Sequence, residues 1–280
     1  MRCKVLKKMV AGVSMAAIAL SLMACGGSSD NTAVTTDEKV TEGSSSTTSI
    51  EGLVTDGKLT FVVDDSVVPC AYRDDDNQLI GFEIDCGNAI GEYLGLDVEW
   101  TTNAWENLIT TVQTGKADGV IDGLYVTDER KEVVDFCDSY YSMDEVIVCK
   151  KGNDEIQKPE DLIGKKVGVQ PASADLEDVK KLGVEDISEY SRIPDGIMDI
   201  SNGRIDAFVT ESLCAAYYGK GDDYDIRLDN PLGSAEIGIA TNKNTPEVTK
   251  AINEAIAALK ADGTLSEISE KWFDADIITK

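Results

Sequence analysis

The chain has 280 residues, of which 42% are hydrophobic, and this is enough apolar material for one large or two modest globular domains. Its 26 basic residues against 52 acidic residues give a formal charge of −26, so nucleic acid and anionic membrane surfaces are poor partners for the folded part. The sequence contains no histidine, which excludes histidine-based triads, imidazole general bases and the commonest zinc ligand.

The first predicted element is a secretory signal over residues 1–24. Basic residues precede an apolar run from Met9 to Met23, which is too short to span a bilayer comfortably as a mature helix. The run ends in "LMAC" followed by "GGSSD", which resembles the bacterial lipoprotein cleavage box, where the cysteine becomes the lipidated first residue. A lipid on Cys25 would hold the protein at the cell membrane from outside the cytoplasm. The alternative is an ordinary signal peptide whose cysteine is incidental.

A segment rich in Ser, Thr and Gly follows, and residues 25–55 are interpreted as the lipidated cysteine and a flexible tether. Beyond the tether, the spacings of the cysteines match no metal pattern. We expect buried or free thiols with at most one or two disulfides, and neither a metal nor a cofactor. These cysteines are Cys70, Cys86, Cys137, Cys149 and Cys214.

Strands and helices alternate from Lys58 onward, which is typical of parallel sheets with crossover helices. "LTFVVDD" predicts a buried strand and "IDCGNAIGEYLGL" a helix. In "NAWENLITTVQTG", Asn103 is expected to cap a helix that ends at Gly115. Near the C-terminus, Thr245 and Gly263 should bound another helix, and a last helix follows it.

Two stretches of the sequence repeat in the same order. "TGKADGVIDG" at 114–123 and "NGRIDAFVTE" at 202–211 share a glycine, a basic residue, an aspartate and an apolar strand at identical offsets. "KLTFVVDDS" at 58–66 is similarly matched by "KKVGVQPAS" at 165–173. Short matches of this kind recur in α/β proteins, but their common order favours two related lobes.

Acidic residues follow the predicted strands. In open parallel sheets, ligands bind beyond the carboxyl ends of the strands. This rule predicts a ligand site at the mouth of the two lobes, built from Asp64, Asp65, Asp122, Gly123 and Glu211.

The sequence from 58 to 274 resembles the extracytoplasmic solute-binding proteins of ABC importers, in particular the polar amino-acid-binding family. The resemblance rests on "QLIGFEIDCGNAIGEYLGL", "WENLITTVQTGKADGVIDGLYVTDERKEVVDFCDSYY", "EDLIGKKVGVQPAS", "NGRIDAFVTESLCAAYY" and "ALKADGTLSEISEKWF". It implies an α/β fold with two lobes, each a mainly parallel sheet flanked by helices, joined by two crossover hinge strands. The crossings are expected near 145–150 and 235–240. Lobe 1 would then comprise 56–146 plus 237–280, and lobe 2 would comprise 147–236.

The resemblance also implies roles for individual residues. Arg130 would grip the α-carboxylate of an amino acid with its planar guanidinium fork, helped by backbone N–H groups from Gly123 to Tyr125. Glu211 would bind the α-ammonium, although many relatives carry the shorter aspartate there. The alternative for Arg130 is a surface ion pair with Asp128 or Glu129.

Further pocket residues are expected in both lobes. Trp105 lies where a pocket wall is expected, or else is an ordinary core tryptophan. Ser173 and the backbone of Ala174 are candidate carboxylate donors at a helix start.

The ligand class is predicted from Asp64, Asp65 and Asp122, which are expected at the side-chain end of the site. The resemblance implies that the position matching Asp64 contacts the side-chain end in relatives that bind cationic amino acids, and that relatives commonly have a small hydroxyl residue in place of Asp122. An extra carboxylate there disfavours an anionic ligand and suits arginine, lysine or ornithine. The alternatives are a polar uncharged amino acid or cystine, with Asp122 only capping a turn or pairing with Lys116.

The expected partners are a free amino acid and the permease of an ABC transporter, with the protein itself a monomer that is not an enzyme. Two other functions remain open from sequence. One is a ligand-sensing lipoprotein with the same pocket. The other is an enzyme like the periplasmic cyclohexadienyl dehydratases, which resemble this fold and use carboxylates.

Overall fold

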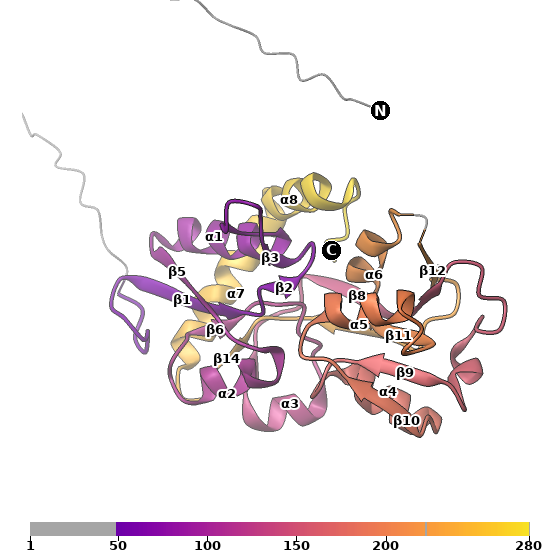
Figure 1. The fold of residues 1–280 in the computed structure, drawn as a ribbon. Coiled ribbons are helices and arrows are strands. Elements are labelled where there is room, and N and C mark those ends of the chain that lie inside the picture. The colour runs from indigo at the N-terminus through magenta and orange to yellow at the C-terminus, as the bar shows by residue number, and fades with distance from the viewer. Residues whose placement is uncertain (1–48, 222, 280) are drawn as a thin grey trace, which may run out of the picture. The chain divides into compact units, whose positions relative to one another are not determined.

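The computed structural model describes residues 49–221 and 223–279. The predicted signal, Cys25 and most of the predicted tether lie outside the described residues. Within the described part of the chain, no helix combines the length and the apolar character needed to cross a membrane. The chain forms two large sheets flanked by helices (Figure 1), so the predicted α/β class is confirmed.

The first sheet and its flanking helices are called lobe 1. Its strands lie in the order β5-β1-β6-β14-β7. They are β1 (Lys58–Val63), β5 (Asp97–Thr102), β6 (Gly119–Val120), β7 (Asp135–Phe136) and β14 (Ala240–Thr241). Strand β1 runs parallel to β5 and β6, whereas β14 is antiparallel to β6 and β7. A small sheet follows β1 and consists of β2 (Ser66–Val67), β3 (Ala71–Arg73) and β4 (Leu79–Ile80).

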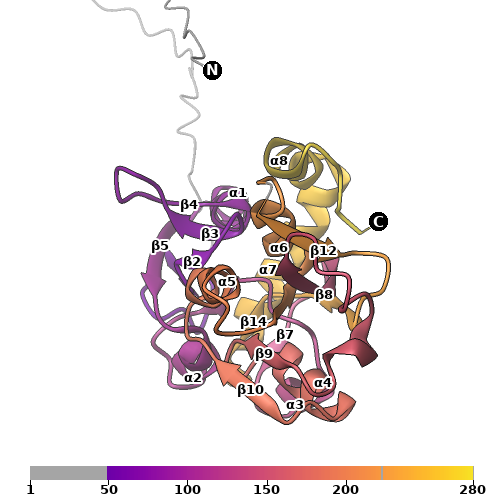
Figure 2. The same ribbon diagram turned by 45° about the vertical axis from the view of Figure 1, so that its right-hand side comes forward.

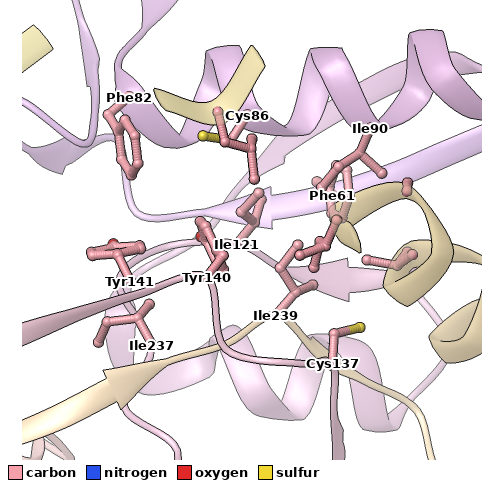
Figure 3. Packing of buried hydrophobic residues seen from close by; sticks show 14 of the residues in the cluster. Phe61, Phe82, Cys86, Ile90, Ile121, Cys137, Tyr140, Tyr141, Ile237 and Ile239 are labelled. Atoms are coloured by element: carbon pink, nitrogen blue, oxygen red, sulfur yellow. The ribbon is translucent and has the colours of Figure 1, made fainter. Parts of the chain in front are cut away.

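Helices cover both faces of the lobe 1 sheet. They are α1 (Phe82–Leu94), a 3-10 turn (Trp105–Asn107), α2 (Leu108–Gln113), α3 (Asp128–Val133), α7 (Pro246–Ala261) and α8 (Thr264–Phe273). Phe61 and Val63 pack in the cluster with α1 and α7, while Val62 packs with α2, because side chains alternate along a strand. Figure 3 shows Phe82, Cys86 and Ile90 of α1 above Phe61.

The second sheet and its helices are called lobe 2. Its strands lie in the order β10-β9-β11-β8-β12, and β13 also pairs with β8. They are β8 (Tyr141–Lys150), β9 (Lys166–Val169), β10 (Asp186–Glu189), β11 (Ala207–Glu211), β12 (Tyr224–Arg227) and β13 (Gly233–Ile237).

Helices also cover both faces of the lobe 2 sheet. They are a 3-10 turn (Pro159–Leu162), α4 (Ala174–Leu182), α5 (Ile193–Ser201) and α6 (Ser212–Tyr218). Helix α4 packs in one apolar cluster with Val167 and Val169, while α5 and α6 pack in another with Phe208 and Val146. The two views in Figures 1 and 2 show α4 on the side of β9 away from α5.

The repeated sequences make the same contact in each lobe. The carboxylate of Asp118 accepts a hydrogen bond from the amide of Thr60 at 2.7 Å, and that of Asp206 accepts one from the amide of Lys166 at 2.8 Å. The backbone amides of the two aspartates bond back to the carbonyls of Thr60 and Lys166. An aspartate therefore fixes β6 beside β1 in lobe 1 and β11 beside β9 in lobe 2, which supports the interpretation of two related lobes.

Two short segments carry the chain between the lobes. One lies between the end of β7 at Phe136 and the start of β8 at Tyr141, and the other between Ile237 and Ala240. The boundaries expected at 146/147 and 236/237 fall within β8 and at the end of β13, both strands of the second sheet. We propose the segments at 137–140 and 238–239 as the hinge.

The lobes are also in direct contact with each other. Val67 and Cys70 of lobe 1 pack in the same apolar cluster as Cys214 of α6. The side-chain amide of Gln170 in lobe 2 donates to Asp64 of lobe 1 at 3.4 Å. All five cysteines of the described chain are free and buried, as the sequence predicted.

One predicted helix start is wrong. Asn103 accepts a hydrogen bond from the adjacent amide of Ala104 at 2.9 Å rather than capping a helix. The following residues form the 3-10 turn, and α2 begins only at Leu108. The predicted end at Gly115 agrees with its left-handed φ of 68°, a conformation that glycine adopts without strain.

Candidate functional site

The carboxyl ends of four parallel strands, two from each lobe, bring buried polar residues together. Asp64 follows β1, Asp122 follows β6, Gln170 follows β9, and Glu211 ends β11. Their exposed fractions are 3%, 1%, 3% and 6%. This is the edge at which open parallel sheets bind ligands.

Asp64 and Asp122 are held mainly by local hydrogen bonds. The carboxylate of Asp122 accepts the amide of Asp64 at 2.7 Å. Asp64 in turn accepts the amide and the hydroxyl of Ser66 at 2.9 and 2.7 Å. Burial raises the pKa of both carboxyl groups. One oxygen of Asp122 has no hydrogen-bond partner among the residues that the structure describes.

Gly123 adopts a left-handed φ of 63° and its amide donates to Glu83 at 3.0 Å. Glu83 is fully buried and also accepts the hydroxyls of Tyr140 and Tyr141. The amide of Gly123, expected to bind a ligand, is therefore used inside lobe 1. The contact fixes the backbone that leads to Tyr125.

Arg130 is placed by the start of α3. Thr127 accepts the amide of Arg130 at 3.2 Å and so caps this helix. The guanidinium donates to the carbonyl of Tyr125 at 3.0 Å and, across the cleft, to the carbonyl of Ala172 at 3.4 Å. Its Cζ atom lies 5.8 Å from the ring centre of Trp105, which is itself a buried core residue.

Arg130 is 9% exposed, and burial lowers the pKa of its guanidinium. No carboxylate of residues 49–221 or 223–279 lies within ion-pair distance of it. The surface pair with Asp128 or Glu129 considered from sequence does not form, and Asp128 pairs with Lys131 instead at 3.4 Å. A buried guanidinium in this state can bind an anionic group.

Ser173 and Ala174 lie at the start of α4. The hydroxyl of Ser173 accepts the amide of Leu176 at 3.1 Å and donates to the carbonyl of Gln170 at 2.8 Å. Ala172, just before it, has a left-handed φ of 57°. This turn presents the start of α4 to Arg130 across the cleft.

Buried carboxylates lie near Arg130 on the lobe 2 side. Glu211 accepts the hydroxyl of Thr210 at 2.9 Å, and burial raises its pKa. Two further acids were not predicted as site residues, namely Asp175 and Glu145, each 3% exposed. One oxygen of each, and the hydroxyl of Tyr125, lack a hydrogen-bond partner within the described chain.

A cavity of about 670 Å³ opens between the two lobes beside these groups. Of the predicted residues, Tyr125, Arg130, Ser173 and Ala174 line it, whereas Asp64, Trp105, Asp122, Gly123 and Glu211 are not part of its wall. The wall holds five acidic side chains against two basic ones. Its residues are Ile109, Tyr125, Thr127, Glu129, Arg130, Glu132, Val133, Glu145, Ala172, Ser173, Ala174, Glu177, Asp178, Lys181, Gly233, Ser234 and Ala235.

Comparison with known proteins adds the context of this site. The family model described as bacterial extracellular solute-binding proteins, family 3, matches residues 59–275. The L-cystine-binding protein TcyJ of Escherichia coli (strain K12) is 32% identical over 225 residues, which cover 79% of this chain and 84% of TcyJ.

Solved structures are similar over most of the chain. An ancestral arginine-binding protein bound to arginine has a TM-score of 0.74 and 37% identity, covering 78% of this chain and 98% of that chain. The ancestral amino acid-binding protein AncCDT-1, described as a precursor of cyclohexadienyl dehydratase, has a TM-score of 0.71 and 33% identity, covering 78% and 95%.

Proposed function

Because the chain belongs to family 3 of the bacterial extracellular solute-binding proteins, we propose that it binds a cationic amino acid between its lobes and delivers it to the permease of an ABC importer. The proposed ligands are arginine, lysine and ornithine. The family assignment made from sequence is confirmed.

The proposal is supported chiefly by the balance of charge around the cavity. An α-amino acid carries one carboxylate and one ammonium, which Arg130 and the buried carboxylate of Glu211 would neutralise. Three buried carboxylates lie close together in lobe 2, those of Glu145, Asp175 and Glu211, and one oxygen each of Glu145 and Asp175 receives no hydrogen bond within the described chain. The wall acids Glu129, Glu132 and Glu177 are exposed. Burying several carboxylates is costly unless positive charge pairs with them. A ligand with a second positive charge supplies it.

The same ligand class was predicted from Asp64 and Asp122, but the support now comes from other acids. Asp122 accepts the backbone amide of Asp64, Asp64 accepts two hydrogen bonds from Ser66, and neither carboxylate lines the cavity. The similarity to the ancestral arginine-binding protein points to the same class. The similarity to TcyJ keeps cystine as the second candidate.

Calorimetry with arginine, lysine, ornithine, glutamine, glutamate and cystine tests the ligand class. We expect tight binding of at least one basic amino acid, which at about 100 times its Kd should stabilise the protein by about 2.7 kcal/mol in a thermal-shift assay. Tight binding of cystine, glutamine or glutamate without heat from any basic amino acid would contradict the cationic assignment and leave the family unchanged.

We propose binding without catalysis. TcyJ, the ancestral arginine-binding protein and AncCDT-1 are all described as binding proteins. Incubation with prephenate or arogenate should therefore yield no product, and turnover would assign an enzyme. A sensor would use the same pocket. Only for a transport protein should cellular uptake of the ligand depend on this protein as well as on the permease.

We propose that the protein acts as a monomer outside the cytoplasm, anchored by a lipid on Cys25. Cys25 lies outside the described residues, and the cleavage box "LMAC" supports the anchor. The variant Cys25→Ser should be released from the membrane fraction or kept as an uncleaved precursor, because its lipid attachment site is gone. Membrane fractionation and the mass of the mature chain measure this. A membrane-bound variant processed at the normal site would disprove the lipid anchor.

A further inference from the structure

Glu145 occupies an unusual place for a carboxylate. It lies on β8, between Glu211 of β11 and Gly233 of β13, which are its direct partners in the two neighbouring strands. Side chains of directly paired residues share one face of a sheet, and like charges placed opposite each other are destabilising. The structure therefore places two carboxylates side by side on a buried face, and something must offset their repulsion.

A third carboxylate is close to Glu145. A Cβ atom built on Gly233 would lie 3.4 Å from Oε2 of Glu145 and 3.3 Å from Oδ2 of Asp178 on α4, so both carboxylates converge on this glycine. Asp178 forms an ion pair with Lys181 at 2.7 Å, and the side chain of Lys181 is 74% exposed. The lack of a side chain at Gly233 leaves the space between them open to the cavity.

The cavity reaches this pair of carboxylates. Arg130, Ser173, Glu145, Asp178 and Gly233 all line it. Oε2 of Glu145 is buried and receives no hydrogen bond from an N–H or hydroxyl donor in the described ranges 49–221 and 223–279, and the group beside it is another acid, Asp178. An unpartnered buried acceptor is costly, so a donor from a bound molecule would be favoured here. The cavity thus joins a buried guanidinium in lobe 1 to a buried carboxylate in lobe 2.

We propose that Glu145, with Asp178 beside it, determines specificity by binding the cationic end of the ligand's side chain, a primary ammonium or a guanidinium. This inference rests on the proposed function, in which Arg130 binds the α-carboxylate. A cation at Glu145 pairs with its free oxygen and offsets the repulsion from Glu211 and Asp178. A neutral side chain offers Glu145 no positive charge, so Glu145 would keep its proton and gain no ion pair.

Binding should also be linked to a proton. Burial, followed by the charge of Asp178, raises the pKa of Glu145 to about 8, so the carboxyl is mostly protonated at neutral pH without ligand. The other charged groups near it are Asp175, Glu211, Lys181, Arg130 and the phenol of Tyr125.

A cationic ligand favours the ionised form of Glu145, and its binding therefore releases a proton. The affinity for basic amino acids should rise with pH below about 8, by at least about tenfold between pH 6 and pH 7.5. The affinity for a neutral amino acid such as glutamine should change much less over the same range.

Calorimetry on the variant Glu145→Gln tests the inference. We expect affinity for arginine and lysine to fall at least about tenfold, with little loss for glutamine, and the rise between pH 6 and pH 7.5 to disappear. Asp178→Asn should lower the affinity in the same direction but more weakly. The Asp178 side chain is partly exposed, so this variant should still fold. Glu189→Gln, on exposed β10 outside the cavity wall, removes the same charge and should leave binding unchanged.

The outcomes separate this inference from the proposed function. A wild-type protein that binds no basic amino acid refutes the proposed function, whatever Glu145 does. A wild-type protein that binds arginine, together with Glu145→Gln and Asp178→Asn variants that keep both its affinity and its pH profile, refutes the subsite alone. An equal loss for arginine and glutamine would make Glu145 a structural residue and overturn its role in specificity.

Discussion

Arg130→Ala should weaken amino-acid binding at least about thirtyfold, a loss of about 2 kcal/mol or more. The guanidinium is buried and held by the carbonyls of Tyr125 and Ala172. It forms no ion pair within the described residues, so its charge is available to a ligand carboxylate. Removing it leaves that carboxylate desolvated and unpaired. Calorimetry with the preferred amino acid measures the loss.

Two variants sharpen this test. Arg130→Lys keeps the charge but not the planar fork, so we expect an intermediate affinity. Arg204→Ala removes an exposed guanidinium that pairs with Asp199 at 2.7 Å, and binding should not change. If Arg130→Ala bound the amino acid with the wild-type Kd, Arg130 would not be part of the site.

Glu83→Ala should lower the free energy of unfolding by about 3 kcal/mol or more, because one buried carboxylate accepts three hydrogen bonds. Its donors are the hydroxyls of Tyr140 and Tyr141 and the amide of Gly123. The side chain is fully buried, so water cannot replace it. Denaturant unfolding with and without saturating ligand measures the loss.

The isosteric variant Glu83→Gln is the matched control. Gly123 and Tyr141 both donate to Oε1, so an amide oxygen in that place can still accept two of the three hydrogen bonds, and this variant should lose less stability than Glu83→Ala. The affinity for the amino acid should also fall in Glu83→Ala. Glu83 holds Gly123, and the backbone from Gly123 leads to the carbonyl of Tyr125 that Arg130 binds. A loss of stability below about 1 kcal/mol for Glu83→Ala would show that the tyrosines and Gly123 find other partners.

The arrangement of the two lobes could be predicted from the sequence because it follows from short sequence patterns that recur in both lobes. Asp118 and Asp206 recur at the same offset from a glycine and a strand, and they bond to the matching strands β1 and β9. The helix over Phe82–Leu94 likewise follows from its periodicity. The start of α2 was missed, because Asn103 finds a closer backbone amide than the one a capping residue bonds to.

The acidic part of the site was harder to predict. Asp64 and Asp122 were predicted as ligand residues; Asp64 bonds to Ser66 and Asp122 to the backbone amide of Asp64, while one oxygen of Asp122 has no partner among the described residues. Glu145 lies in the middle of β8 and resembles an ordinary strand residue in the sequence. Its position opposite Glu211 follows only from the pairing of β8 with β11, a contact between residues far apart in sequence, which a single sequence does not reveal.

The strand order of lobe 1 has a consequence for the order in which the two lobes can fold. Strand β14 lies between β6 and β7, and β7 pairs with no other strand of the described chain. All strands of lobe 2 precede β14 in the sequence. Because domains fold as units while the chain emerges from its N-terminus, lobe 2 can complete its sheet first. Lobe 1 begins earlier in the sequence, but its sheet is complete only after residues 240–241 have taken their place between β6 and β7.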